Sequence, residues 1–111
     1  MSYPFDRGEY RIPYPPSARP RLILGEGEFA VVDCSQRGLR YVAAVGELPE
    51  IGSVIEGRVR LLSKREWLDV TGKVVRIQDG EVAVHLERPG IPMQRVYDEQ
   101  RYLARHFPAR R

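Results

Sequence analysis

Apolar and polar residues alternate with a period of two along most of the chain between residues 18 and 86. This period is typical of strands with one buried face, because successive side chains of a strand point to opposite sides. The pattern predicts six strands, over residues 18–24, 28–33, 39–44, 54–62, 67–77 and 81–86. Six short antiparallel strands joined by tight turns indicate a small barrel.

Glycines mark the expected turns between these strands. Gly25 and Gly27 frame one predicted hairpin turn, and the pair Asp79-Gly80 is a typical signal for a second. Gly72 interrupts the longest predicted strand, and a glycine inside a strand often accompanies a β-bulge. We therefore expect hairpins at both turns and a bulge at Gly72.

The apolar period changes to that of a helix after residue 90. Pro92 suits the first helical turn, and Pro108 ends the pattern. The side expected to pack on the barrel, or on a second copy of the chain, comprises Met93, Val96, Tyr97, Gln100, Leu103, Ala104 and Phe107. The predicted fold is all-β with a C-terminal helix, a six-stranded antiparallel barrel that is a monomer or a homodimer.

Residues 1–17 show no regular period and contain the four prolines Pro4, Pro13, Pro15 and Pro16. Proline fixes φ and has no backbone N–H, so this segment is expected to be extended. We predict a flexible arm over residues 1–17 and a barrel with its closing helix over residues 18–108.

An acid, a hydroxyl and a glycine interrupt two apolar runs at residues 33–38, with the spacing Asp-x-Ser-x-x-Gly. Asp33 and Ser35 are expected on the same side of an extended chain, and Gly38 permits a sharp turn. Such an arrangement suits a small polar ligand at a strand end. Cys34 is expected on the opposite side, as a buried apolar residue.

Composition narrows the function classes. The 111 residues suffice for one domain, and the formal charge of +3 mildly favours anionic partners. Two histidines and one cysteine show neither metal-ligand nor nucleophile–base spacing, so we predict no enzyme, no metal and no cofactor. The single cysteine, the absence of an apolar run of about 20 residues and the start of the sequence predict a cytoplasmic protein.

Two motifs follow one another along the chain. Arg7 and Arg11 form an Arg-x-x-x-Arg pair, then comes the first predicted hairpin, and then Asp33, Ser35 and Gly38. In this order they resemble the motifs of the PilZ domain, the bacterial receptor module for cyclic di-GMP. Residues 72–77, the Asp-Gly turn and the closing helix are also similar to the second half of that family.

The resemblance implies a role for each motif residue. Arg7 and Arg11 would hold phosphates and guanine edges, since an arginine fork matches the O6 and N7 acceptors of guanine. Asp33 and Ser35 would line the base pocket, where a carboxylate can accept the N–H donors of guanine. Gly38 would leave room for the backbone turn.

The resemblance also implies a signalling role. An arm that the ligand orders can act as a switch, which a protein partner in motility, pilus or polysaccharide machinery would read. The expected function is a ligand-switched adaptor in the control of motility, biofilm or exopolysaccharide. Arg37, at a variable motif position, either contacts the ligand or points to solvent, and we expect solvent.

Two other functions remain open at this point. The same fold could be an adaptor that binds its protein partner without the dinucleotide. A small barrel could also bind single-stranded nucleic acid through basic and aromatic residues, and Arg58 and Arg60 share one predicted strand face. The nearly balanced charge disfavours nucleic acid as a partner.

Overall fold

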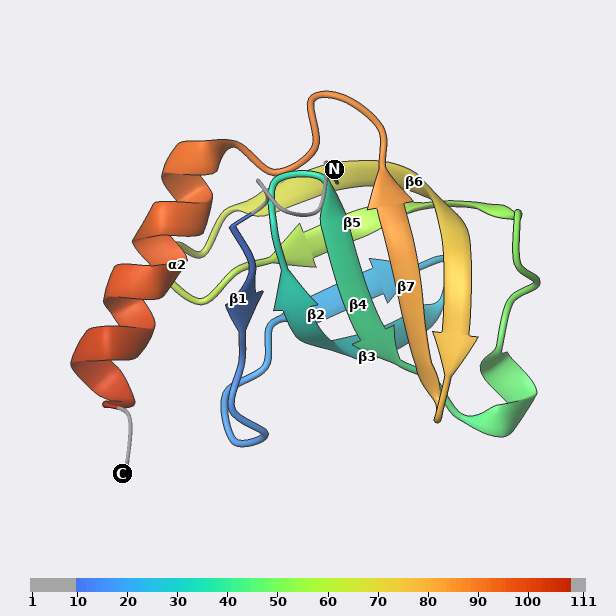
Figure 1. Ribbon diagram of the computed structural model, residues 1–111, viewed down its shortest axis with the longest axis horizontal. Coiled ribbons are helices and arrows are strands. Elements are labelled where there is room, and N and C mark those ends of the chain that lie inside the picture. Colours follow the sequence, from blue (N-terminus) through green and yellow to red (C-terminus); the bar gives the residue numbers. More distant parts are fainter. Residues whose placement is uncertain (1–9, 109–111) are drawn as a thin grey trace, which may run out of the picture.

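Six strands form a closed antiparallel barrel in the computed structural model, which describes residues 10–108 (Figure 1). Strands pair around the ring in the order β3, β2, β5, β6, β7 and β4, and β4 pairs back with β3. The elements are β1 (Ile12–Pro13), β2 (Arg21–Leu24), β3 (Gly27–Cys34), β4 (Gly38–Val42), the 3-10 turn η1 (Val45–Glu47), β5 (Val54–Arg60), β6 (Trp67–Gln78), β7 (Glu81–Leu86) and α2 (Met93–His106). The predicted six-stranded barrel with a C-terminal helix is confirmed.

The alternation in the sequence buries one face of each strand inside the barrel. Leu22 on β2, Val59 on β5 and Val82 on β7 are fully buried. Leu22 and Val59 are direct cross-strand partners, so their side chains lie side by side inside the barrel. β2 begins three residues later than predicted, at Arg21, because Pro20 has no N–H to donate to a neighbouring strand.

The bulge in β6 lies at Val75, and the prediction of a bulge at Gly72 is wrong. The register between β6 and β7 shifts on either side of Val75, whose side chain is exposed. Gly72 keeps regular partners on both neighbouring strands. A Cβ at Gly72 would lie 2.6 Å from the main-chain oxygen of His85, so this glycine serves the close approach of two strands.

Helix α2 lies beside β1 at one side of the barrel (Figure 1). Its buried residues are Arg95, Val96 and Glu99. Met93 and Leu103 are partly buried against the core, as predicted. Val96 is also buried as predicted, but the prediction is wrong for Tyr97, Gln100, Ala104 and Phe107, which are exposed. The buried side of the helix is thus displaced by about one residue from the apolar pattern and includes the charged Glu99.

The described part of the predicted arm, residues 10–17, runs along the barrel. β1 pairs antiparallel with β3, opposite the end of that strand. Ile12 and Tyr14 are both buried in the core. The boundary between arm and barrel at residue 17 stays a prediction, because residues 1–9 lie outside the described residues.

Among residues 10–108, no helix has the length and apolar character needed to cross a membrane.

Candidate functional site

Asp33 stands at the end of β3, and its carboxylate is almost completely buried. A register shift between Val31 and Asp33 marks a bulge in the β3–β4 ladder, and such bulges re-aim side chains. Oδ1 accepts a hydrogen bond of 2.9 Å from Nη1 of Arg11. Oδ2 accepts one of 3.1 Å from Nε of Arg40, and Arg40 Nη2 binds the same oxygen. Two guanidiniums therefore compensate one buried charge.

Arg40 belongs to this site, although the motifs do not include it. It lies directly opposite Asp33 in the β3–β4 register, which brings its side chain over the carboxylate. The hydrogen bond to Asp33 raises the pKa of the Arg40 guanidinium, and burial opposes this rise. Its Nη1 also lies 3.5 Å from a carboxylate oxygen of Glu81 on β7. Pairing the two strands across the motif turn would have identified this residue from the sequence.

The turn between β3 and β4 contains the remaining motif residues. The main-chain N–H of Ser35 donates to the oxygen of Gly38 over 2.8 Å, and the Ser35 hydroxyl lies 3.5 Å from the same oxygen. Ser35 is fully buried. The oxygens of Gln36 and Arg37 accept hydrogen bonds from the N–H groups of Ile91 and Leu86. The turn is therefore fixed to the end of β7.

Arg37 does not simply point into solvent, as the sequence led us to expect. Its Nε donates a hydrogen bond of 2.9 Å to the main-chain oxygen of Leu86, and the residue is partly buried. The turn places its guanidinium beside the cleft described next. Arg7, the first arginine of the leading motif, lies outside the described residues.

A cleft of about 350 Å³ opens on the outer face of the barrel, lined in part by Arg11, which also binds the Asp33 carboxylate. Its lining residues are Arg11, Arg37, Gly38, Leu39, Val75, Arg76, Ala83, Val84 and His85. Among residues 10–108, three arginines and no acidic residue line it. A second hollow of about 210 Å³ adjoins it, because both are lined by Arg76 and Ala83, and Arg40 stands in its wall. Asp79 and Glu81 also line the second hollow, so the excess of positive charge belongs to the first cleft. The charge and size of that cleft suit a small, multiply charged anion.

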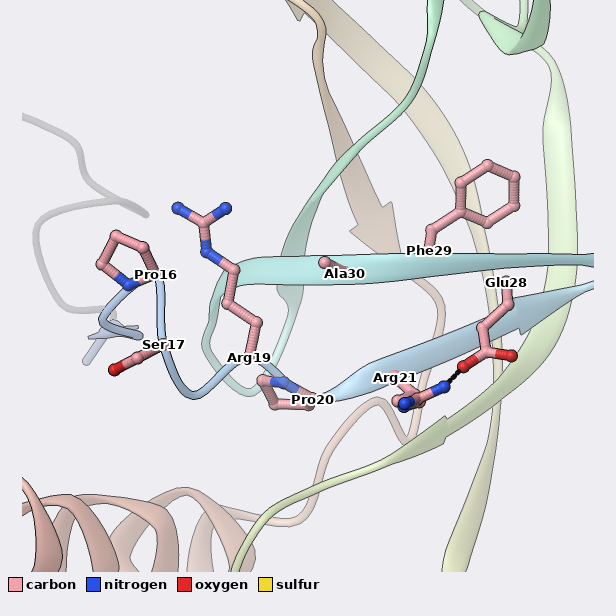
Figure 2. A pocket seen from close by; sticks show the side chains of 8 residues that line it. All are labelled: Pro16, Ser17, Arg19, Pro20, Arg21, Glu28, Phe29 and Ala30. Atoms are coloured by element: carbon pink, nitrogen blue, oxygen red, sulfur yellow. Dashed lines mark ion pairs between the residues drawn. The ribbon is translucent and has the colours of Figure 1, made fainter.

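A larger hollow lies elsewhere on the barrel, between the β1–β2 connection and β3 (Figure 2). It measures about 540 Å³ and is lined by Pro16, Ser17, Arg19, Pro20, Arg21, Glu28, Phe29 and Ala30. None of the motif residues that the structure describes lines it. Arg21 is ion-paired with Glu28 at its rim, as Figure 2 shows, so its charge is already compensated. The motif residues thus single out the smaller cleft.

Within residues 10–108, no group of His, Cys, Asp and Glu side chains has the arrangement of a metal site. His85 is exposed on β7, and His106 stacks on Tyr102 in α2 with ring centroids 4.3 Å apart. Cys34 is buried, as predicted, and burial raises the pKa of its thiol to about 12. A thiol that stays protonated at neutral pH is a poor nucleophile.

Two solved structures share the fold of this chain. A Bacillus subtilis inhibitor of motility, MotI/DgrA, superposes with a TM-score of 0.61 at 16% identity, over 95% of this chain and 53% of that protein. The chain thus spans about half the length of that protein. An uncharacterised Legionella protein superposes with a TM-score of 0.53 at 13% identity, over 84% of this chain and 85% of its own. At these identities the likeness concerns the fold alone.

No curated protein sequence matches the chain. The sequence profile of the PilZ domain, however, matches residues 5–104, nearly the whole length. This range includes both arginines of the leading motif, the Asp33 turn and most of helix α2. PilZ domains are generally non-catalytic receptor domains that typically bind cyclic di-GMP. The chain belongs to the PilZ domain family.

Proposed function

We propose that this domain is a receptor for cyclic di-GMP, which binds in the cleft beside Asp33 and is held by Arg7, Arg11 and the Asp33 turn. The observation that carries the proposal is the Asp33 carboxylate, clamped between Arg11 and Arg40 at the edge of an arginine-lined cleft. Cyclic di-GMP carries two phosphodiester charges and two guanines. The cleft offers cations for the phosphates, and Asp33 offers an acceptor for guanine N–H groups.

Binding would exchange partners at Asp33. The Arg11 side chain is 45% exposed, so it can leave the carboxylate without crossing the core. Its guanidinium then turns to a phosphate or to the O6 and N7 edge of a guanine. The carboxylate, released from one cation, accepts the N1–H and amino group of a guanine. Because the same arginine serves Asp33 without ligand and the anion with it, the arm differs between the two states.

A protein that controls motility, biofilm or exopolysaccharide production would bind this domain and respond to the switch. The resemblance of the motifs to those of PilZ receptors supports this role, and so does the fold shared with an inhibitor of motility. An arm that changes its contacts on binding offers such a partner two different surfaces.

Isothermal titration of the purified protein with cyclic di-GMP tests the proposal, with GMP and cyclic di-AMP as competing ligands. We expect selective binding at micromolar concentration or below, which Arg11→Ala abolishes or weakens. Arg21→Ala is the matched control, because Arg21 is an exposed, ion-paired arginine outside the cleft. Binding that is equal in wild type and Arg11→Ala would refute the assignment of the arm. No binding by the wild type would favour the adaptor that acts without a ligand.

A second candidate function is binding of single-stranded nucleic acid, and one surface favours it. The guanidiniums of Arg58 and Arg60 lie 5.0 and 5.2 Å from the ring centroid of Trp67, which is exposed at the start of β6. Arginine and tryptophan together form a surface on which bases can stack. Fluorescence titration of Trp67 with oligonucleotides at two salt concentrations tests this function, and a salt-dependent change that Arg58→Ala weakens would support it.

A further inference from the structure

Glu99 is a charged residue with no exposure to solvent, at the centre of the interface between α2 and the barrel. Its Oε1 accepts hydrogen bonds from the hydroxyl of Tyr14 over 2.5 Å and from the N–H of Leu62 over 3.0 Å. Its Oε2 accepts one from the N–H of Ser63 over 2.6 Å. The three donors come from the arm and from the turn after β5. One helix side chain therefore joins two separate segments to α2.

Tyr14 extends this network to the motif strand. The Sγ of Cys34 lies 3.6 Å from the Tyr14 oxygen. A phenol has one proton, and the short contact directs it to Glu99, so the thiol of Cys34 is the donor to Tyr14. Burial raises the pKa values of both Tyr14 and Cys34, which keeps both protons in place at neutral pH. A buried chain of hydrogen bonds thus runs from Cys34 through Tyr14 to Glu99.

This series of buried hydrogen bonds lies directly beside the proposed ligand site. Cys34 follows Asp33 on β3 and is the cross-strand partner of Ile12, the residue after Arg11. The N–H of Tyr14 donates to the oxygen of Val32 over 2.9 Å, which holds the arm along β3. On the other side of Arg11, the ring of Tyr10 packs on Tyr97 of α2 with centroids 5.8 Å apart. Helix α2 therefore contacts the arm on both sides of Arg11.

We propose that Tyr14 and Glu99 are positioning residues for the ligand site, which hold β1 so that Arg11 stays within reach of Asp33 and which couple ligand binding to the docking of α2. The inference rests on the proposed function for its ligand. An arm already held in place loses less conformational freedom when Arg11 engages an anion, so binding is tighter. Coupling is reciprocal, so bound ligand also stabilises the docked helix.

Tyr14→Phe tests the proposal, because it removes the hydroxyl and keeps the ring in the core. We expect the dissociation constant for cyclic di-GMP to rise about fivefold, the effect of one lost hydrogen bond. In the wild type, ligand should slow amide hydrogen exchange in residues 93–106, and saturating ligand should no longer do so in Tyr14→Phe. Tyr41→Phe is the control, because Tyr41 is a buried tyrosine of β4 with no contact to α2 among the described hydrogen bonds.

Two results would overturn the positioning role. One is ligand protection of α2 that is equal in Tyr14→Phe and wild type, and the other is an equal loss of affinity in Tyr41→Phe. If Tyr14→Phe does not fold, Cys34→Ala removes the first donor of the same chain and should weaken binding in the same direction.

A measurement without ligand separates this inference from the proposed function. In the ligand-free protein, Tyr14→Phe should speed amide exchange in residues 10–14, and its effect on thermal stability should not add to that of Arg11→Ala. Additive effects and unchanged exchange would refute the positioning role even if the dinucleotide binds. If the wild type binds no dinucleotide but Tyr14→Phe shows both effects, the proposed function is refuted and the coupling between arm and helix stands.

Discussion

Asp33 and Glu99 are two buried carboxylates that hold the same arm, and their partners differ. Asp33 binds the guanidiniums of Arg11 and Arg40, whose side chains are 45% and 36% exposed. Glu99 binds two main-chain N–H groups and a buried phenol. Exposed guanidiniums can leave for water or for an anion, whereas main-chain donors cannot move without unfolding the turn that contains them. Asp33 is therefore suited to exchange its arginine partners for a ligand, and Glu99 is suited to hold the arm permanently.

Removing the Glu99 carboxylate should have the largest effect, a loss in the free energy of unfolding. Glu99→Ala leaves the Tyr14 hydroxyl and the N–H groups of Leu62 and Ser63 buried without an acceptor. We expect the free energy of unfolding to fall by about 3–5 kcal/mol, the usual loss when one side of a buried polar network is removed. Urea denaturation followed by circular dichroism measures this. A loss below about 1 kcal/mol would show that water readily replaces the carboxylate.

Removing the exchangeable carboxylate should affect binding more than folding. Asp33→Ala removes one partner of Arg11 and one of Arg40, and Arg40 keeps its ion pair with Glu81. Both arginines are exposed enough to be hydrated, so the free energy of unfolding should change little. The binding free energy of cyclic di-GMP should weaken by about 1–3 kcal/mol, because a buried acceptor for guanine is lost. Titration calorimetry and urea denaturation of the same variant compare the two effects. Intact affinity in the folded variant would contradict the site.

Alkaline pH should lower the free energy of unfolding through Cys34 and Tyr14, two buried groups in and beside the arm. Burial raises the pKa of Cys34 from its ordinary 9.0 to about 12, and it also raises the pKa of Tyr14 above its ordinary 10.0. The unfolded chain loses these protons above pH 9 and the folded chain keeps them. The contribution of these two groups to the free energy of unfolding is therefore fully present below pH 9 and falls as pH rises toward 12.

Between pH 8 and pH 10 we expect the free energy of unfolding to fall by roughly 1–2 kcal/mol from these two groups. Urea denaturation at both pH values measures the change. The double variant Tyr14→Phe with Cys34→Ala removes both groups and should reduce the pH dependence. A dependence equal to that of the wild type would mean that other groups cause it.

The smallest expected effect concerns the geometry of the clamp on Asp33. Arg40→Lys keeps the charge but loses the guanidinium fork, which reaches Asp33 through both Nε and Nη2. We expect a loss of about 0.5–1 kcal/mol in the free energy of unfolding, as for one partly exposed hydrogen bond. Thermal unfolding compares Arg40→Lys with Arg65→Lys, a matched change at an exposed arginine outside the site. Equal losses in both variants would mean that the fork contributes nothing specific.

Much of the fold follows from local patterns. The period of two predicted every strand of the barrel, with ends that differ by a few residues, because each strand buries one face. The Asp79-Gly80 turn also formed as predicted, with both residues at positive φ. The bulge at Val75 was missed, because it depends on how β6 and β7 align and not on a glycine within β6.

The candidate site was predictable in part. The motif spacing identified Asp33 and Arg11, which the structure brings to 2.9 Å across 22 residues. It did not identify Arg40, because its contact with Asp33 arises from pairing across the motif turn. It also assigned Arg37 to solvent, because no local pattern reveals the carbonyl of Leu86, 49 residues away.

The sequence by itself determined the barrel strands, the closing helix and the two motifs, because alternation, turn residues and short spacings act between near neighbours. Only the tertiary structure decided that Glu99 is buried, with its three donors lying 36 to 85 residues away. A charged residue on a helix is ordinarily solvated, and only partners supplied by distant segments can offset the loss of water around it. The anchoring of the arm is therefore a property of the folded molecule.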